Sequence, residues 1–325
     1  MQTPTLALHV PDRARLDRFV SGGDSRTEDL PGGTMPPARL HFGVEFCEHL
    51  LPSPEDVSAA VEAAGAADRG FTLLTPYGTD RMVDAVEGLV DAAQGARDFE
   101  VVVNDWGVLH RLRSRGGVRL TIGRGLNRMI RDPRIPDVGP EHLGGDAPPD
   151  SWRRSSADSS TFRSMMKSLG IYRVETDVPL QGPPPPPPDD GIRTTVHLPW
   201  GMVASGRICM VNALSKSPSV RLTAPLACNA PCRKYTIELR APWSRREDHA
   251  AVPTVGAGEI LPLSRLLNRR RTELPPRDQD VAPRFFQKGN THFYRLDDDA
   301  LEAAWTWAVN APGVDRVVLE PDLPM

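Results

Sequence analysis

The chain has 325 residues, of which 39% are hydrophobic and 33 are prolines, and its formal net charge is −3. This length fits one large domain or two small ones, and a parallel barrel of about 250 residues with insertions falls within it. The charge is not that of a strongly basic chain, so no nucleic-acid partner is expected. Without a run of about 18 apolar residues, no membrane insertion is expected either.

Apolar runs of strand length recur along the chain. They predict strands at 5–10, 40–46, 71–75, 99–103, 118–122, 171–176, 194–198 and 314–319. Helical patterns separate most of these runs. At the clearest one, Ser53 is a good N-cap and Pro54 occupies the first helical position. Further helices are expected at 11–20, 80–93, 108–115, 160–169 and around 301–308, and a pair of strands is expected at 284–296.

The alternation of strands and helices predicts a parallel α/β fold. The nearly all-apolar strand at 99–103 is typical of a sheet that is buried on both faces. Neither common glycine-rich phosphate loop occurs, which favours a TIM-barrel-like parallel barrel over an open nucleotide-binding sheet. We therefore expect residues 1–325 to form a single barrel-like domain. Exposed, irregular insertions are expected near 131–158, at 181–192 with its six consecutive prolines, and at 241–283.

The four cysteines stand where a barrel could bring them together. Cys47 follows the strand predicted at 40–46, whereas Cys209, Cys228 and Cys232 cluster later in the chain, beyond the strand that ends at residue 198. The functional pole of a parallel barrel lies at the carboxyl ends of its strands, so we expect all four thiols there. Thiolate ligands suit zinc or an iron–sulfur cluster. The competing interpretation is four unpaired thiols that pack as small apolar groups.

Polar residues at the ends of buried strands are the candidates for chemistry. Asn104 and Asp105 follow the strand at 99–103 and are candidates for binding substrate or handling a proton. Capping of the following helix is the favoured alternative for this pair. His197, on a strand before the cysteine cluster, is interpreted as a histidine of the core or of the surroundings of the site.

Charged residues near the cysteines add further candidates. Glu45 lies on the same side of its strand as Cys47, so it is a candidate for tuning a metal centre or binding substrate. Its alternative role is an ion pair with an arginine. Glu175 shares one face of a strand end with Asp177 and is a further candidate for these roles. Arg124 could hold a carboxylate or a phosphate.

Short motifs occur along residues 42–292 in an order that resembles a known family. They are Phe42–Cys47 (FGVEFC), Asp105–Val108 (DWGV), Gly123–Asn127 (GRGLN), Ser205–Cys209 (SGRIC), the pair Cys228 and Cys232 followed by Arg233-Lys234-Tyr235, and the turn Lys288–His292 (KGNTH). On these motifs the chain resembles peptidase family U32, and within it the V-type iron–sulfur proteins of oxygen-independent ubiquinone biosynthesis. The four-cysteine pattern is the most specific part of this resemblance.

The resemblance implies a barrel-like fold and a 4Fe–4S cluster on Cys47, Cys209, Cys228 and Cys232. It also implies a role in hydroxylation without molecular oxygen, on an aromatic, quinone-like or other small metabolite, as a heterodimer with a second U32-family subunit. The chain departs from the family in its three insertions and in the long gap between Cys209 and Cys228.

Two other functions stay open at this point. The chain could be a non-catalytic partner subunit that a metal stabilises, or it could be a U32-type peptidase. The sequence shows no Ser/His/Asp or Cys/His arrangement with interpretable spacing, and H-E-x-x-H is absent. The N-terminus lacks the pattern of a signal peptide, so we expect a cytoplasmic protein, in which thiols stay reduced.

Overall fold

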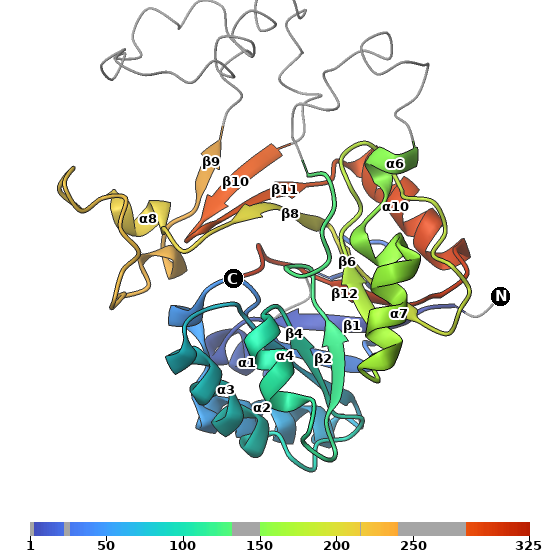
Figure 1. Cartoon of the computed structure of the whole chain (residues 1–325), viewed down its shortest axis with the longest axis horizontal. Coiled ribbons are helices and arrows are strands. Elements are labelled where there is room, and N and C mark those ends of the chain that lie inside the picture. Colours follow the sequence, from blue (N-terminus) through green and yellow to red (C-terminus); the bar gives the residue numbers. More distant parts are fainter. Residues whose placement is uncertain (1–2, 23–26, 132–149, 215, 240–283) are drawn as a thin grey trace, which may run out of the picture.

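Eight parallel strands close into a barrel in the computed structural model, which describes residues 3–22, 27–131, 150–214, 216–239 and 284–325 (Figure 1). Around the barrel their order is β1-β12-β7-β6-β5-β4-β3-β2. Their bounds are Thr5–Val10 (β1), Arg39–Gly43 (β2), Gly70–Thr75 (β3), Glu100–Val103 (β4), Arg119–Ile122 (β5), Arg173–Thr176 (β6), Arg193–Leu198 (β7) and Val314–Leu319 (β12). The predicted TIM-barrel-like α/β fold is confirmed.

Most of the helices lie on the outside of the barrel. The described helices are α1 (Arg13–Val20), α2 (Pro54–Ala66), α3 (Asp80–Ala92), α4 (Trp106–Leu112), α6 (Asp150–Arg153), α7 (Ser160–Ser168), α8 (Met210–Ala213) and α10 (Asp298–Asn310), with short 3₁₀ turns η1 (Glu48–Leu50), η3 (Ser156–Asp158) and η4 (Pro231–Arg233). Of these, α8 and η4 lie away from the barrel and next to each other, and α8 also lies next to β10 (Arg284–Lys288). At the start of α2, Ser53 and Asp56 form a reciprocal capping box. Among the described residues, no helix is long and apolar enough to cross a membrane.

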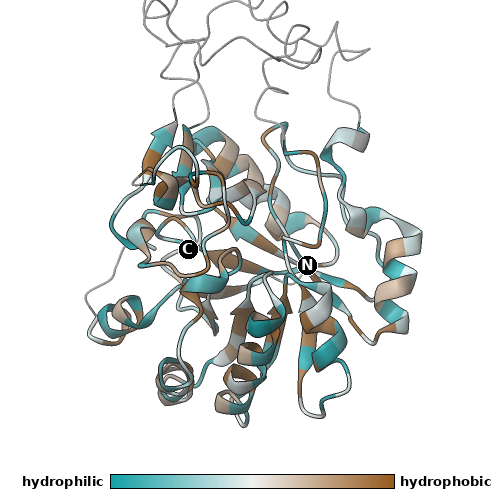
Figure 2. Cartoon of the chain, turned by 60° about the vertical axis from the view of Figure 1, so that its left-hand side comes forward, coloured by the Kyte–Doolittle hydropathy of each residue, from teal (hydrophilic) through white to brown (hydrophobic). Residues whose placement is uncertain are grey.

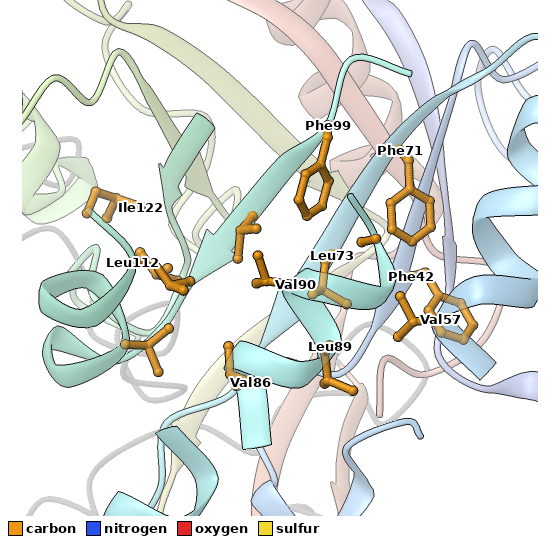
Figure 3. Close-up of a cluster of buried hydrophobic side chains, with 14 of the residues drawn as sticks. Phe42, Val57, Phe71, Leu73, Val86, Leu89, Val90, Phe99, Leu112 and Ile122 are labelled. Atoms are coloured by element: carbon orange, nitrogen blue, oxygen red, sulfur yellow. The ribbon is translucent and has the colours of Figure 1, made fainter. Parts of the chain in front are cut away.

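The apolar core lies between the barrel strands and these helices. Figure 3 shows Phe42, Phe71 and Leu73 of the strands packed near Val57 of α2 and Leu89 of α3. These five side chains are at most 3% exposed. In Figure 2 the hydrophobic colour concentrates on the central strands, and the surrounding helices carry most of the hydrophilic colour. Burial of this layer is the main apolar driving force for folding.

The inside of the barrel, by contrast, is largely polar. Successive side chains of a strand point to opposite faces, so Phe42 packs outward while Arg39 and His41 point inward. Near the amino ends of the strands, buried Glu100 accepts a hydrogen bond of 2.6 Å from Arg316 and lies 3.7 Å from Arg39. Burial alone would raise the pKa of Glu100, but the two guanidinium groups lower it to about 2. The barrel interior therefore depends on paired charges rather than on aliphatic packing.

A second sheet packs on the carboxyl pole of the barrel. It is antiparallel, in the order β8 (Trp200–Ser205), β11 (Thr291–Arg295), β10 (Arg284–Lys288) and β9 (Ile237–Leu239). Met202 and Phe293 of this sheet share one apolar cluster with Val44 and Phe46, which follow β2. The strand pair predicted at 284–296 is present, whereas β8 and β9 were not predicted.

The predicted insertions lie where the barrel departs from a regular alternation. The proline segment 181–192 connects β6 to β7 in the place of a helix. Residues 132–149 of the insertion predicted at 131–158, and the whole insertion predicted at 241–283, lie outside the described residues. The strand predicted at 40–46 ends early, at Gly43, whose φ of +108° does not continue an extended strand.

Replacing Gly201 by Ala is expected to destabilise the second sheet. A Cβ at this position would overlap the ring of Tyr294, which is fully buried and held by a hydrogen bond of 2.6 Å to the Val178 carbonyl. We expect a loss of about 1–3 kcal/mol in the free energy of unfolding, measured by urea denaturation. The control is Gly88→Ala in α3, where a Cβ meets no atom and the helix gains about 1 kcal/mol. Equal stability of the two variants would contradict the packing described here.

Candidate functional site

The four cysteines come together at the carboxyl pole of the barrel. Cys47 lies four residues beyond β2, Cys209 follows β8 of the second sheet, and Cys228 and Cys232 lie in the connection to β9. All four line one hollow of about 480 Å³, part of which is open to solvent. None of them forms a disulfide. Three separate segments of the chain thus supply four thiols to a single site.

The turn between β10 and β11 holds these segments against one another. The side-chain amide of Asn290 donates hydrogen bonds of 2.6 Å to the carbonyls of Phe46 and Gly206, just ahead of the first two cysteines. Gly289 has a φ of +57°, and a Cβ there would lie 2.6 Å from Met325 and 3.5 Å from the Cβ of Cys232. The turn therefore needs glycine and asparagine at these positions because of how closely the cysteine segments pack.

The surroundings of the sulfurs suit a buried metal–thiolate group. Backbone amides donate to two of them: Asn212 N lies 3.3 Å from Cys209 Sγ, and Ala230 N lies 3.4 Å from Cys228 Sγ. Burial, helped by the neighbouring cysteines, raises the pKa of Cys47 to about 12. A metal bound by these thiols would have to displace protons, as it does whenever thiolates become ligands. Hydrogen bonds to sulfur are one of the ways in which proteins tune iron–sulfur centres.

A network of buried charges lies beside the hollow, centred on Arg124. Its guanidinium group donates to both carboxylate oxygens of Glu45, to Asp177 at 3.0 Å and to Glu320 at 2.7 Å. Arg131 donates to the other oxygen of Asp177, also at 3.0 Å. Arg124 is 0% exposed. Residues that follow β2, β5, β6 and β12 are thus joined by one fully buried cation.

Two histidines extend this network into the barrel. His197 lies 2.9 Å from Glu320 and 3.0 Å from Glu175, and His41 lies 3.1 Å from the other oxygen of Glu175. Burial and Arg124 lower the pKa of His197, but the two carboxylates outweigh them and raise it to about 10. Burial lowers the pKa of His41 to about 4. At neutral pH, His197 is therefore an imidazolium ion and His41 is neutral.

A metal ion does not fit this network well. Ligand atoms of Glu45, Glu175 and His197 lie within 4.8 Å of one another, a spacing that a metal ion could bridge. However, Glu45 already pairs with Arg124, and Glu175 already pairs with both histidines. The charges of the trio are thus compensated within the protein, and a cation would have to displace these partners.

Phe46 connects the network to the hollow. Its ring lies 5.5 Å from the Arg124 guanidinium carbon, and it also lines the hollow beside Cys47. The Trp200 carbonyl of β8 accepts a hydrogen bond of 3.3 Å from Arg124 and so closes the barrel over the network. One aromatic ring therefore separates fixed, buried charges from the four thiols.

The other predicted residues have structural partners. Asn104 accepts a hydrogen bond of 2.7 Å from Gly125 N and donates to the Thr75 carbonyl, so it holds the loop that carries Arg124. Asp105 is the N-cap of α4. Their roles in substrate binding or proton handling stay predictions, as do those of Glu45 and Glu175, which lie in the network.

Sequence reasoning missed three members of the network: Glu320, His41 and Arg131. A signal for Glu320 was present, because it directly follows an apolar strand, as Asp177 does. His41 is two residues before Gly43 and four before Glu45, on the same inward face of β2. No local pattern marks Arg131, which reaches Asp177 from a loop.

Comparisons with known proteins give little further information. No protein-family model matches the chain, and no curated protein matches it. Among solved structures, the U32 peptidase Mk0906 aligns with a TM-score of 0.35 and 11% sequence identity, over 62% of this chain and 71% of that one. A likeness at this level carries no argument about function.

Replacing Arg124 by Met is expected to cost about 3–5 kcal/mol of stability, because it leaves buried carboxylates without their cation. Arg119→Met is the control, since Arg119 lies on β5, the strand that precedes Arg124, but its side chain is 59% exposed and its ion pairs contribute little. Urea denaturation measures both variants. An Arg124 variant as stable as the control would show that the network does not hold the barrel mouth together.

The stability of the protein is expected to fall with rising pH because of His197. The pKa of His197 in the folded state, about 10, is above the ordinary value of about 6.5. Its contribution to the free energy of unfolding is therefore complete below pH about 6.5 and is lost as the pH rises to about 10. His197→Gln should lack this part of the slope when the free energy of unfolding is measured across that range. The exposed His110→Gln should keep the slope of the wild type. Parallel curves for all three proteins would disprove the imidazolium assignment.

Proposed function

We propose that Cys47, Cys209, Cys228 and Cys232 bind a 4Fe–4S cluster, and that the chain is the iron–sulfur subunit of an oxygen-independent hydroxylase. The substrate would be an aromatic, quinone-like or other small metabolite. The observation that carries the proposal is the convergence of four free thiols, from three segments, on one hollow at the carboxyl pole of a parallel barrel. The hydroxylase part rests on the motif resemblance to family U32.

The donor set supports an iron–sulfur cluster. Four cysteines are the usual ligands of a 4Fe–4S cluster. The two amide-to-sulfur hydrogen bonds are of the kind that tunes the potential of such a cluster. A bound cluster would supply one-electron chemistry. The carboxyl pole is also where barrel enzymes carry their active sites.

The residues around the hollow have separable tasks in this proposal. Asn290 keeps the cysteine segments in register through its two carbonyl contacts. Tyr77 lies on the polar wall of the hollow, where its hydroxyl bonds to Ser205 and to the Gly206 carbonyl at 3.1 Å. We assign Tyr77 to the wall that a small aromatic metabolite would meet. The buried charges around Arg124 fix the electrostatic field on the inner side of the site.

The resemblance to family U32 extends the proposal to partners and location. It implies a heterodimer with a second U32-family subunit. A cytoplasmic location agrees with four cysteines that are all free thiols.

The metal content of anaerobically purified protein tests the cluster. We expect brown protein with about four iron atoms per chain and the electron paramagnetic resonance signal of a reduced cluster. Cys228→Ala should lose most of this iron, and because Cys228 is only half-buried its removal should leave the fold intact. Ala224→Ser is the control, since it changes the wall of the hollow without removing a thiol. One zinc ion per chain would favour a non-catalytic, metal-stabilised subunit instead, and metal-free wild-type protein would exclude both.

Anaerobic growth of the host organism tests the hydroxylase assignment. A strain that lacks the gene should accumulate a metabolite one oxygen atom lighter than the product of the wild type, as measured by mass spectrometry. The wild-type gene should restore the product, and the Cys228→Ala gene should not. An unchanged metabolite profile, together with proteolysis by the purified chain that survives loss of the metal, would support the peptidase function instead.

A further inference from the structure

The segment that carries three of the cysteines has an unusual charge. Between Gly206 and Ile237 the chain has no Asp or Glu, although its net charge is −3. The same segment holds five cationic residues, all of them exposed: Arg207, Lys216, Arg221, Arg233 and Lys234. Of these, Arg207 has an acidic neighbour, Glu48, at 3.9 Å. The segment that supplies three of the four thiols is therefore basic on a chain that is acidic as a whole, and Arg207 of this segment lines the hollow.

The same segment also exposes most of the large apolar side chains on the surface. Among the described residues, twelve large hydrophobic side chains are exposed, and seven of them fall here. They are Ile208, Met210, Leu214, Val220, Leu222, Leu226 and Tyr235. Leu226 is 98% exposed and Leu214 is 68% exposed. A concentration of this kind on a soluble protein marks a site of interaction.

This surface lies directly outside the four thiols. Ala224 and Pro225 line the hollow, while Leu226, the next residue, points away from the protein. Cys228 is the one thiol of the four that is only half-buried. Figure 1 shows the part of the chain around α8 at the edge of the molecule, projecting beyond the second sheet. A partner bound there would be separated from the site by the wall of the hollow alone.

The chemistry of the surface selects the partner. Aliphatic side chains within a basic rim match an acidic protein with an apolar centre, because complementary charge steers the encounter and apolar contact holds it. Proteins that bind single-stranded nucleic acid use stacked aromatic side chains, and here Tyr235 is the sole exposed aromatic residue of the segment. A protein that docks beside a redox centre fits the class of electron carriers, which in general bind through small interfaces.

We propose that residues 206–214 and 216–235 form the docking surface for an acidic one-electron carrier protein, which exchanges electrons with the centre held by the four cysteines. The proposal rests on the proposed function, because it needs a redox-active centre in the hollow. In the exchange, the reduced carrier gives up one electron and becomes oxidised, and the centre is reduced by that electron. No covalent bond forms or breaks.

Binding of an acidic carrier tests the docking surface. The probes are a plant-type 2Fe–2S ferredoxin and a flavodoxin, each titrated against the anaerobic, iron-loaded chain by isothermal calorimetry. We expect binding that weakens as salt increases. The double charge reversal Lys216→Glu with Arg221→Glu should weaken it at least tenfold, and Leu222→Ser with Leu226→Ser should weaken it at any salt concentration.

Matched variants on other exposed surfaces serve as controls. Arg119→Glu and Val20→Ser change a similarly exposed cation and a similarly exposed apolar residue, and they should leave binding unchanged. Iron content is measured on every sample. Iron-loaded protein that binds neither carrier overturns the docking proposal, as does equal binding by the wild type and the segment variants. Tighter binding to an RNA oligonucleotide, or self-association that the segment variants abolish, would also overturn it. Wild-type protein without iron would overturn the proposed function instead, whatever the carriers do.

Discussion

The ion pairs of Arg124 are the interaction on which the arrangement of this protein depends. A guanidinium group with no exposed surface joins Glu45, Asp177 and Glu320, which follow three different strands of the barrel. Buried charges are costly unless each has a partner with good geometry, so this network fixes how the strand ends meet. Glu45 lies two residues before Cys47. The same contact that closes the barrel mouth thereby positions the first cysteine.

The second sheet adds what an ordinary barrel lacks. It covers the carboxyl pole, brings Cys209 and Cys232 to Cys47, and holds them through the turn at Gly289 and Asn290. The cysteines themselves lie in connecting segments, but Cys47, Cys209 and Cys232 belong to an apolar cluster that also includes Met202 and Phe293 of the second sheet. The rigid side of the site is thus the barrel, and the exposed side is the basic, apolar segment around α8. Because one side of the hollow is held by the barrel and the other is exposed, a centre bound in the hollow could exchange electrons with a protein docked on the exposed side.

The barrel could be predicted from the sequence because each strand has an apolar outer face that packs on helices. The second sheet could not be predicted in full from the sequence. β8 follows β7 after Pro199 alone, which looks like the end of a strand, and β9 is only three residues long and pairs with β10, 45 residues later in the chain. The four cysteines could be recognised by residue type, but Glu320 and His41 could not be assigned without the strand order. Local patterns reveal elements, whereas buried networks depend on contacts between residues distant in the sequence.

We propose that an iron–sulfur cluster lies among the four cysteines. Anomalous diffraction at the iron edge, from crystals grown without oxygen, tests it most directly. We expect a single strong iron peak in the hollow, within bonding distance of the sulfurs of Cys47, Cys209, Cys228 and Cys232. A peak at the zinc edge alone, or iron bound elsewhere in the protein, would contradict it.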